Sequence, residues 1–203
     1  MEYFELHPEN PQQRYINKAV ETLRKGGVII YPTDTVYGLG CDIFNREAVE
    51  RIYMIKNETD TKLFSFLCSD LKDISKYAKV SDYAYKAMKK LIPGPYTFVL
   101  PAAKEVPKKL WTKRKTVGIR IPENEIARTL ALELGNPIIS TSATTRLGQI
   151  LFDPQEIRSV FNLSVDLMLS MGALKGVPSS IIDLSGEEAE IIREGSGDLS
   201  IFY

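Results

Sequence analysis

The sequence is poor in the residues that disulfide frameworks, zinc sites and histidine-based catalysis require. Its 203 residues include two cysteines, Cys41 and Cys68, and one histidine, His7. Two cysteines cannot form the dense disulfide network of small secreted proteins, so a reducing environment is favoured. The single histidine stands beside Pro8, which predicts a surface residue rather than a triad member or a metal ligand. No metal-binding residues are predicted.

The sequence also lacks the apolar segments that secretion and membrane insertion need. The opening residues MEYFELHPENPQQR contain no basic stretch followed by an apolar run, so they do not resemble a signal peptide. No apolar run approaches the roughly 20 residues that a membrane-spanning helix requires. These features predict a cytoplasmic protein without a membrane partner.

Neither net charge nor the familiar nucleotide-binding loops indicate a ligand. Lys plus Arg equals Asp plus Glu, at 26 each, so the overall charge gives no argument for nucleic acid. The patterns Gly-x-x-x-x-Gly-Lys-Ser/Thr and Gly-x-Gly-x-x-Gly after a strand are both missing. A bound nucleotide would therefore be held without those loops.

What the sequence does have is a regular alternation of strand-like apolar runs and amphipathic helices. Asn10, Asn45 and Asp153 are expected to cap helices, and Gly26 and Gly27 to end the first one. The expected helices cover 11–25, 46–55, 81–91, 123–134 and 154–161. The expected strands cover 28–31, 63–68, 96–100, 116–120, 137–141, 165–169, 179–184 and 190–194. This order predicts an α/β fold with a twisted sheet flanked by helices, and the short turns between the last strands predict a mixed parallel and antiparallel sheet. We expect one domain over residues 1–203, with its core at about 14–200.

The stretch VIIYPTDTVYGLG, residues 28–40, joins a buried strand to a cluster of hydroxyls and glycines. Such a cluster is compatible with a simple chain reversal or with a pocket for a small ligand. In open α/β sheets, ligands tend to bind beyond the carboxyl ends of strands. Thr33, Asp34 and Thr35 stand at such an end.

Two further strand ends carry polar groups. Arg120 closes the apolar strand 116–120, and a buried charge in that position needs a partner or solvent. Strand 137–141 runs into the hydroxyl-rich sequence STSATT, and Lys56 and Lys62 follow the second helix. Hydroxyls and fixed cations suit carboxylate and phosphate oxygens, although turns, caps and solvated lysines would produce the same residues.

One segment is strongly basic. Residues 104–120 contain seven Lys or Arg against one acid, Glu105, with Trp111 in the middle. Such a segment can bind a phosphate backbone and stack a base, or it can be a solvated connector. The candidate nucleic-acid contacts are Lys108, Lys109, Lys113, Arg114 and Lys115.

Several blocks taken together resemble the YrdC-like family, which contains the threonylcarbamoyl-adenylate synthases. The blocks are GGVIIYPTDTVYGLGCD, IYMIK with a second lysine after it, LIPGPYTFVL, VGIRIPEN and NPIISTSAT, and the resemblance as a whole covers the chain from about Asn17 to Arg193. The resemblance implies a mixed sheet around a concave, basic cavity. It also implies synthesis of threonylcarbamoyl-adenylate from L-threonine, bicarbonate and ATP, with Mg²⁺ accompanying the nucleotide. Catalysis would then rest on positioning and electrostatic stabilisation.

The resemblance also implies residue roles. Thr33, Tyr37 and Ser180 would contact the threonine, and Arg120 would clamp its carboxylate. The residues implied on the nucleotide side are Lys56, Lys62, Ser140, Ser142, Thr144 and Arg193. Lys56, Lys62 and Arg120 would be the catalytic residues.

Both motifs expected to handle ATP depart from the family pattern. The pattern Lys-x-Arg-Pro-x-x-Lys-Pro-Leu appears as KNETDTKLF, with Glu58 in place of the arginine. The pattern Ser-Thr-Ser-Ala-Asn-x-Ser-Gly appears as STSATTRL, with Thr144 in place of the asparagine. An acid beside a polyphosphate repels it, so we expect altered ATP binding.

These departures, with the opening HPENPQQR, resemble the YciO-like branch of the family. Three hypotheses follow. The first is a synthase, active or diverged. The second is a tRNA- or double-stranded-RNA-binding module without synthase activity, and the third is an enzyme for another nucleotide or amino acid. A monomer or weak homodimer is expected.

Overall fold

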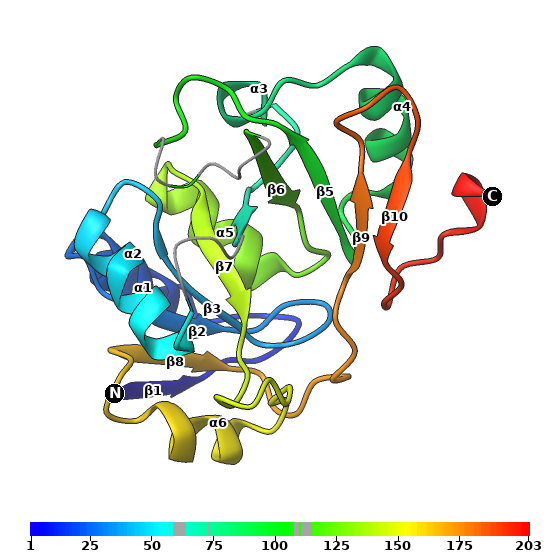
Figure 1. Cartoon of the computed structure of the whole chain (residues 1–203). Coiled ribbons are helices and arrows are strands. Elements are labelled where there is room, and N and C mark those ends of the chain that lie inside the picture. Colours follow the sequence, from blue (N-terminus) through cyan, green and yellow to red (C-terminus); the bar gives the residue numbers. More distant parts are fainter. Residues whose placement is uncertain (59–63, 73, 108–109, 111–114) are drawn as a thin grey trace.

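The computed structural model describes residues 1–58, 64–72, 74–107, 110 and 115–203, and their main feature is a ten-stranded sheet (Figure 1). The strands are β1 (Glu2–Glu5), β2 (Ile29–Tyr31), β3 (Gly38–Asp42), β4 (Ser65–Leu67), β5 (Tyr96–Pro101), β6 (Thr116–Arg120), β7 (Ile138–Ser142), β8 (Leu167–Ser170), β9 (Ser180–Asp183) and β10 (Glu190–Arg193). Their order in the sheet is β1-β8-β2-β3-β7-β4-β6-β5-β9-β10.

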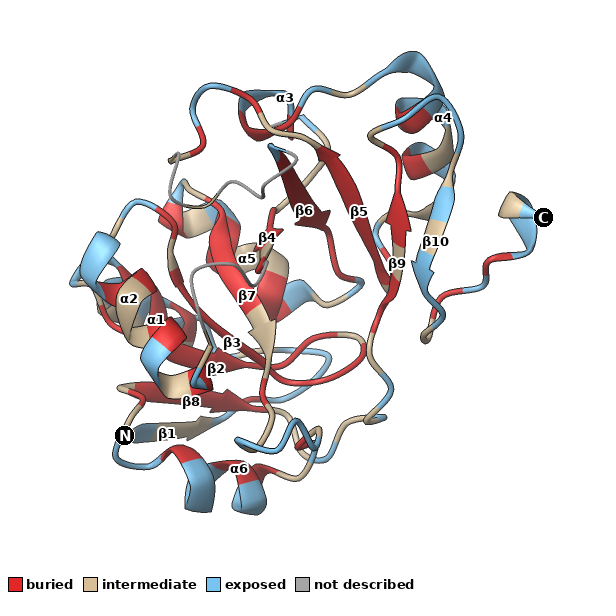
Figure 2. Ribbon diagram, viewed as in Figure 1, coloured by how far each residue is buried: buried red, intermediate tan, exposed pale blue. Residues whose placement is uncertain are grey.

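The sheet is mixed, as the sequence predicts. The pairs β1/β8, β2/β8, β4/β6 and β5/β9 are parallel, and the other neighbouring pairs are antiparallel. Figure 2 shows buried strands in the middle of the sheet, whereas the residues of the edge strands β1 and β10 are exposed or intermediate. The predicted α/β fold with flanking helices is confirmed.

The helices are α1 (Gln13–Arg24), α2 (Arg46–Lys56), α3 (Ile74–Tyr77), α4 (Asp82–Leu91), α5 (Glu125–Leu134) and α6 (Pro154–Phe161). Two predicted caps are present: the Asn45 side chain accepts a hydrogen bond from the N–H of Ala48, and Asp153 accepts from Gln155 and Glu156. The predicted cap at Asn10 is wrong. Helix α1 begins after Gln12, whose side chain makes no capping bond. None of the helices in the described ranges is both long and apolar enough to cross a membrane.

Strand β3 was not predicted, because its sequence GLGCD contains two glycines, which are depleted in strands. The fold needs both glycines for close packing. A Cβ on Gly38 would lie 2.7 Å from the Tyr31 ring, and one on Gly40 would lie 2.4 Å from the Ile139 carbonyl oxygen. The cluster after Tyr31 is thus a turn, residues 32–37, that leads directly into the antiparallel partner of β2.

Helices α1 and α5 cover only part of one face of the sheet. Residues two apart on a strand point to the same face, so Ser65 shares a face with Leu67, and Ser140 with Ile138. Leu67 and Ile138 pack in one apolar cluster with residues of α1 and α5. Helix α5 ends at Gly135, in the left-handed conformation, just before β7 begins. The part of the face that carries Ser65 and Ser140 lines a cavity.

A larger apolar cluster forms on the opposite face, where α2, α3 and α4 pack. It includes Ile52, Met88, Phe66, Phe98 and Ile119, all buried. Burial of each such side chain contributes about 1.5–3 kcal/mol. Because side chains pack closely on this face, the strands that line the cavity on the other face are held in place. His7, predicted to be a surface residue, is exposed.

Candidate functional site

The cavity has a volume of about 260 Å³ and extends across seven neighbouring strands, β3, β7, β4, β6, β5, β9 and β10. Its polar lining includes Ser65, Thr97, Ser140, Ser142 and Ser179, and its apolar lining includes Val36, Phe64, Val99, Ile181 and Ile192. Among the described residues, the charged side chains that line it are Arg120 and Arg193, both cationic. The expected concave, basic cavity is therefore present. Its composition suits a small anionic ligand with an apolar part.

Arg120, the last residue of β6, is the most firmly placed of the candidate residues. It is 7% exposed, and its carbonyl oxygen accepts a hydrogen bond from the N–H of Cys68. Its Nη2 lies 2.7 Å from Asp34 Oδ1, 2.7 Å from Thr35 Oγ1 and 3.3 Å from Thr33 Oγ1. The turn after β2 thus supplies the partner that the sequence requires for this charge.

Thr33 and Tyr37, the residues expected to contact threonine, both line the cavity, but their hydroxyls already have protein partners. Thr33 Oγ1 donates to the Val36 carbonyl oxygen at 2.6 Å. The Tyr37 hydroxyl donates to the Gly172 carbonyl at 2.6 Å and accepts from the N–H of Met171 at 3.1 Å. Burial raises the pKa of this hydroxyl, which keeps it protonated. Both side chains shape the cavity wall, and their role in threonine binding stays a prediction.

Arg193 approaches the cavity from β10. Its Nε and Nη2 donate to the Ser179 carbonyl oxygen at 3.1 and 2.8 Å. Burial and, secondarily, the positive charge of Arg120 lower the pKa of the Arg193 guanidinium. Arg193 is an exposed residue and Arg120 a buried one, but both line the same cavity, which favours an anionic ligand between them. The predicted contact of Arg193 with phosphates is compatible with this position.

Ser180 is not placed for the predicted contact with threonine. It is completely buried, and its Oγ donates to the Gly197 carbonyl and accepts from the N–H groups of Gly195 and Gly197. Its neighbour Ser179 lines the cavity instead, with its hydroxyl 2.9 Å from Thr97 Oγ1. Adjacent residues in an extended chain point to opposite faces, so Ser179 takes the position at the cavity that was expected for Ser180. Ser180 fixes the segment after β10.

Ser180→Ala is expected to lower the free energy of unfolding by about 2–3 kcal/mol, because two N–H groups lose their acceptor and one carbonyl loses its donor. Urea denaturation measures this change. Ser159→Ala is the control: this exposed serine bonds only its own helix, and its loss should cost less than about 0.5 kcal/mol. Equal effects of the two variants would contradict the role of Ser180.

The two motifs expected to handle ATP are joined in the structure. Lys56, the last residue of α2, donates from Nζ to the Ser142 carbonyl oxygen at 3.1 Å and also to Thr144 Oγ1. Ser140 and Ser142 line the cavity from β7, and Ser140 Oγ accepts a hydrogen bond from the Tyr31 hydroxyl at 2.7 Å. The Lys56 ammonium group thus donates a hydrogen bond to Thr144, the residue that stands in place of the expected asparagine.

Several candidate residues lie outside the described residues: Lys62, Lys108, Lys109, Lys113 and Arg114, together with Trp111. Lys115 is described and exposed, and its backbone carbonyl accepts from the N–H of Ala102. The nucleic-acid surface therefore stays a prediction.

Sequence reasoning did not assign a role to Asp34, Ser179, Thr97 or Phe64, all of which contribute to the site or to its support. Asp34 stood among the strand-end residues, and its pairing with Arg120 required knowledge of the neighbouring strands. Ser179 and Thr97 could have been found from the alternation of side chains, had the register of β5 and β9 been known.

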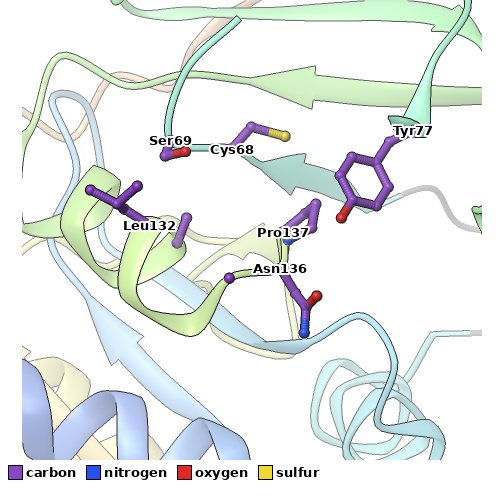
Figure 3. A pocket seen from close by; sticks show the side chains of 8 residues that line it. Cys68, Ser69, Tyr77, Leu132, Asn136 and Pro137 are labelled. Carbon is purple, nitrogen blue, oxygen red and sulfur yellow. The ribbon is translucent and has the colours of Figure 1, made fainter. Parts of the chain in front are cut away.

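A second hollow is too small to compete as the functional site (Figure 3). It measures about 40 Å³ and is lined by Cys68, Ser69, Tyr77, Leu132, Asn136 and Pro137, among others. This space admits only a few waters, and its described lining carries no fixed charge.

Comparison with known proteins decides the family. A family model named for the Sua5, YciO and YrdC proteins, and described as "Telomere recombination", matches residues 21–195. The chain belongs to this family. YciO of Escherichia coli is 45% identical over 203 residues, which cover 99% of this chain and 98% of YciO. The crystal structure of E. coli YciO has a TM-score of 0.95 and full coverage of both chains.

Members of the family with a named activity are more distant. A threonylcarbamoyl-AMP synthase of Coxiella burnetii is 37% identical over 157 residues, covering 76% of this chain and 83% of the synthase. The crystal structure of P. abyssi Sua5 with L-threonine has a TM-score of 0.90 at 27% identity, and covers 96% of this chain and 58% of Sua5. The greater similarity to YciO confirms the predicted placement in the YciO-like branch.

Proposed function

We propose that the cavity binds L-threonine and ATP and that the protein forms threonylcarbamoyl-adenylate, with bicarbonate as the third substrate. The observation that carries this proposal is the buried guanidinium of Arg120 in a cavity lined by hydroxyls. Two relatives add support, since one is named a threonylcarbamoyl-AMP synthase and another was crystallised with L-threonine.

The proposed reaction needs no covalent bond to the protein. The threonine amine adds to the carbon of bicarbonate with loss of water, and an oxygen of the resulting carbamate displaces pyrophosphate from the α-phosphorus of ATP. Arg120 would hold the threonine carboxylate and thereby fix the position of the amine. Holding the reactants in this order converts a three-component encounter into one bound complex, which is a large source of rate enhancement.

The cationic end of the cavity would receive the phosphates. Arg193 lies on β10, and Lys56 would contact phosphate oxygens only after leaving Thr144. Mg²⁺ would enter with the nucleotide and would shield the departing pyrophosphate. Glu58, two residues after Lys56, opposes the approach of a polyphosphate, so a weak or altered affinity for ATP is part of the proposal.

Release of pyrophosphate should depend on the presence of both L-threonine and bicarbonate. The assay measures pyrophosphate with ATP, Mg²⁺ and each substrate omitted in turn, and identifies the nucleotide product by mass spectrometry. Release at the level of a heat-inactivated control would overturn the synthase proposal. Release with a different amino acid or nucleotide would instead support the hypothesis of an enzyme with another substrate.

A further inference from the structure

Asp34 lies behind Arg120 and supplies its counter-charge. The two side chains are 10% and 8% exposed, and the shortest contact between them is 2.7 Å. A guanidinium this far from water needs a charged partner, because hydroxyls alone do not offset the loss of hydration. Arg120 lines the cavity, whereas Asp34 is not among the lining residues.

The pair uses only one edge of the guanidinium. The side-chain hydrogen bonds that Arg120 makes to described residues all leave from Nη2, to Thr33, Asp34 and Thr35. Its Nε is buried without a partner, and so is Asp34 Oδ2. Nη1 makes no hydrogen bond to the described residues and is not sealed from solvent. The pairing therefore decides that Nη1 is the nitrogen available to a ligand.

The turn that carries Asp34 is itself fixed. Thr33 Oγ1 donates to the Val36 carbonyl at 2.6 Å and accepts from the N–H of Thr35 at 3.2 Å. Side chains that bond their own turn in this way hold its backbone in one conformation. The carboxylate of Asp34 thus stands on a preorganised support, as does the backbone of Arg120 beside β4.

We propose that Asp34 is a positioning residue for carboxylate recognition: it holds Nη2 of Arg120 so that Nη1 faces the cavity and meets the carboxylate of the ligand. This inference rests on the proposed function, because it takes the ligand to be an amino acid bound through its carboxylate. Asp34 acts only through Arg120 and touches no reacting atom.

Charge neutralisation alone would give the opposite result from positioning. Asp34 cancels much of the positive charge of Arg120, so its removal would strengthen the attraction for any anion by Coulomb's law. If positioning dominates, removal of the Asp34 carboxylate weakens carboxylate binding. The guanidinium of Arg120 can then rotate, and ordering it when the ligand binds costs free energy. The direction of the change in carboxylate affinity therefore distinguishes positioning from charge neutralisation.

The first part of the test needs no ligand. The ¹⁵N-resolved guanidinium signals of Arg120 report rotation of its Nη groups by NMR. In the unaltered protein, we expect slow rotation about the Cζ–Nη2 bond. In Asp34→Asn we expect rotation at least about tenfold faster, since the charge-assisted bond is lost. Equal rotation in both proteins would overturn the proposal, whether or not the protein binds threonine.

The second part compares L-threonine with L-threoninamide, which has no carboxylate, by calorimetry. Asp34→Asn should weaken binding of L-threonine by at least about tenfold and change binding of L-threoninamide by less than about twofold. Asp34→Glu keeps the negative charge and should recover part of the preference for L-threonine over L-threoninamide. Asp166→Asn is the matched control, since it removes an aspartate paired with Arg51 outside the cavity, at 2.9 Å.

The outcomes are distinguishable. A preserved or increased preference of Asp34→Asn for L-threonine would overturn the positioning role. If the unaltered protein binds neither compound, the proposed function fails, and the NMR comparison alone decides whether Asp34 positions Arg120.

Discussion

Replacing Arg120 by Gln should weaken binding of L-threonine by about 100-fold, which corresponds to about 2.7 kcal/mol. The reason is that Arg120 is the one cationic side chain of β6, within the described residues, and that it lines the cavity. Arg193, the other cationic lining residue, is held on the Ser179 carbonyl and cannot take over the same position. Calorimetry with L-threonine measures the loss. An affinity within about threefold of the unaltered protein would contradict the role of Arg120.

The same variant should also be less stable, and a second variant separates the two effects. Arg120→Gln leaves the Asp34 carboxylate buried without its counter-charge, which typically costs about 3–5 kcal/mol. The double variant Arg120→Gln with Asp34→Asn removes both charges and should recover most of that stability in urea denaturation. It should not recover threonine binding, because the carboxylate still lacks its guanidinium. Recovery of both properties would mean that Arg120 acts only in folding.

Restoring the two altered motifs, with Glu58→Arg and Thr144→Asn together, should tighten ATP binding by about tenfold or more. Glu58 follows the left-handed cap Asn57 at the end of α2, two residues after Lys56. A guanidinium at position 58 replaces repulsion of the phosphates by charge-assisted hydrogen bonds, each of about 1.5–3 kcal/mol. The substitution at position 144 removes the hydroxyl that Lys56 now contacts. Titration with ATP and Mg²⁺ measures the gain.

The control for this variant is Glu187→Arg, which makes the same charge reversal at an exposed position in the turn between β9 and β10. It should change ATP affinity by less than about twofold, since exposed charges more than a Debye length away, about 8 Å, are screened at physiological salt. No gain in the double variant, or an equal gain in the control, would show that positions 58 and 144 do not face the phosphates.

The structure supports an unequal division of the proposed site. On the threonine side, Arg120 and Thr33 are brought together by the turn after β2, and both line the cavity. On the nucleotide side, Lys56 contacts Thr144 and the backbone of β7. A carboxylate therefore meets a guanidinium that is already in place, whereas a nucleotide must first break the hydrogen bond between Lys56 and Thr144. For this reason we expect amino acid binding to be the more robust property.

Local sequence chemistry was sufficient for most elements of the fold. Asn45 and Asp153 cap their helices because their side chains bond backbone groups only two or three residues away. Runs such as TVGIR form strands because apolar, β-branched residues suit a sheet buried on both faces. Asn10 failed as a cap because the helix starts later. Strand β3 escaped prediction because its glycines serve contacts with Tyr31 and Ile139, which come from other parts of the chain.

Sequence patterns alone were enough to predict the mixed α/β sheet, the family, and the need of Arg120 for a partner or solvent. The sheet follows from side-chain periodicity and helix caps, and the need of Arg120 for a partner follows from the cost of burying a charge. The family follows from the resemblance of several sequence blocks to known members. The three-dimensional arrangement was needed to show that Asp34 is that partner, that Ser179 rather than Ser180 lines the cavity, and that Lys56 contacts Thr144. The physical reason is strand register: a shift of one residue turns every side chain to the other face, and register is set by pairing between distant segments.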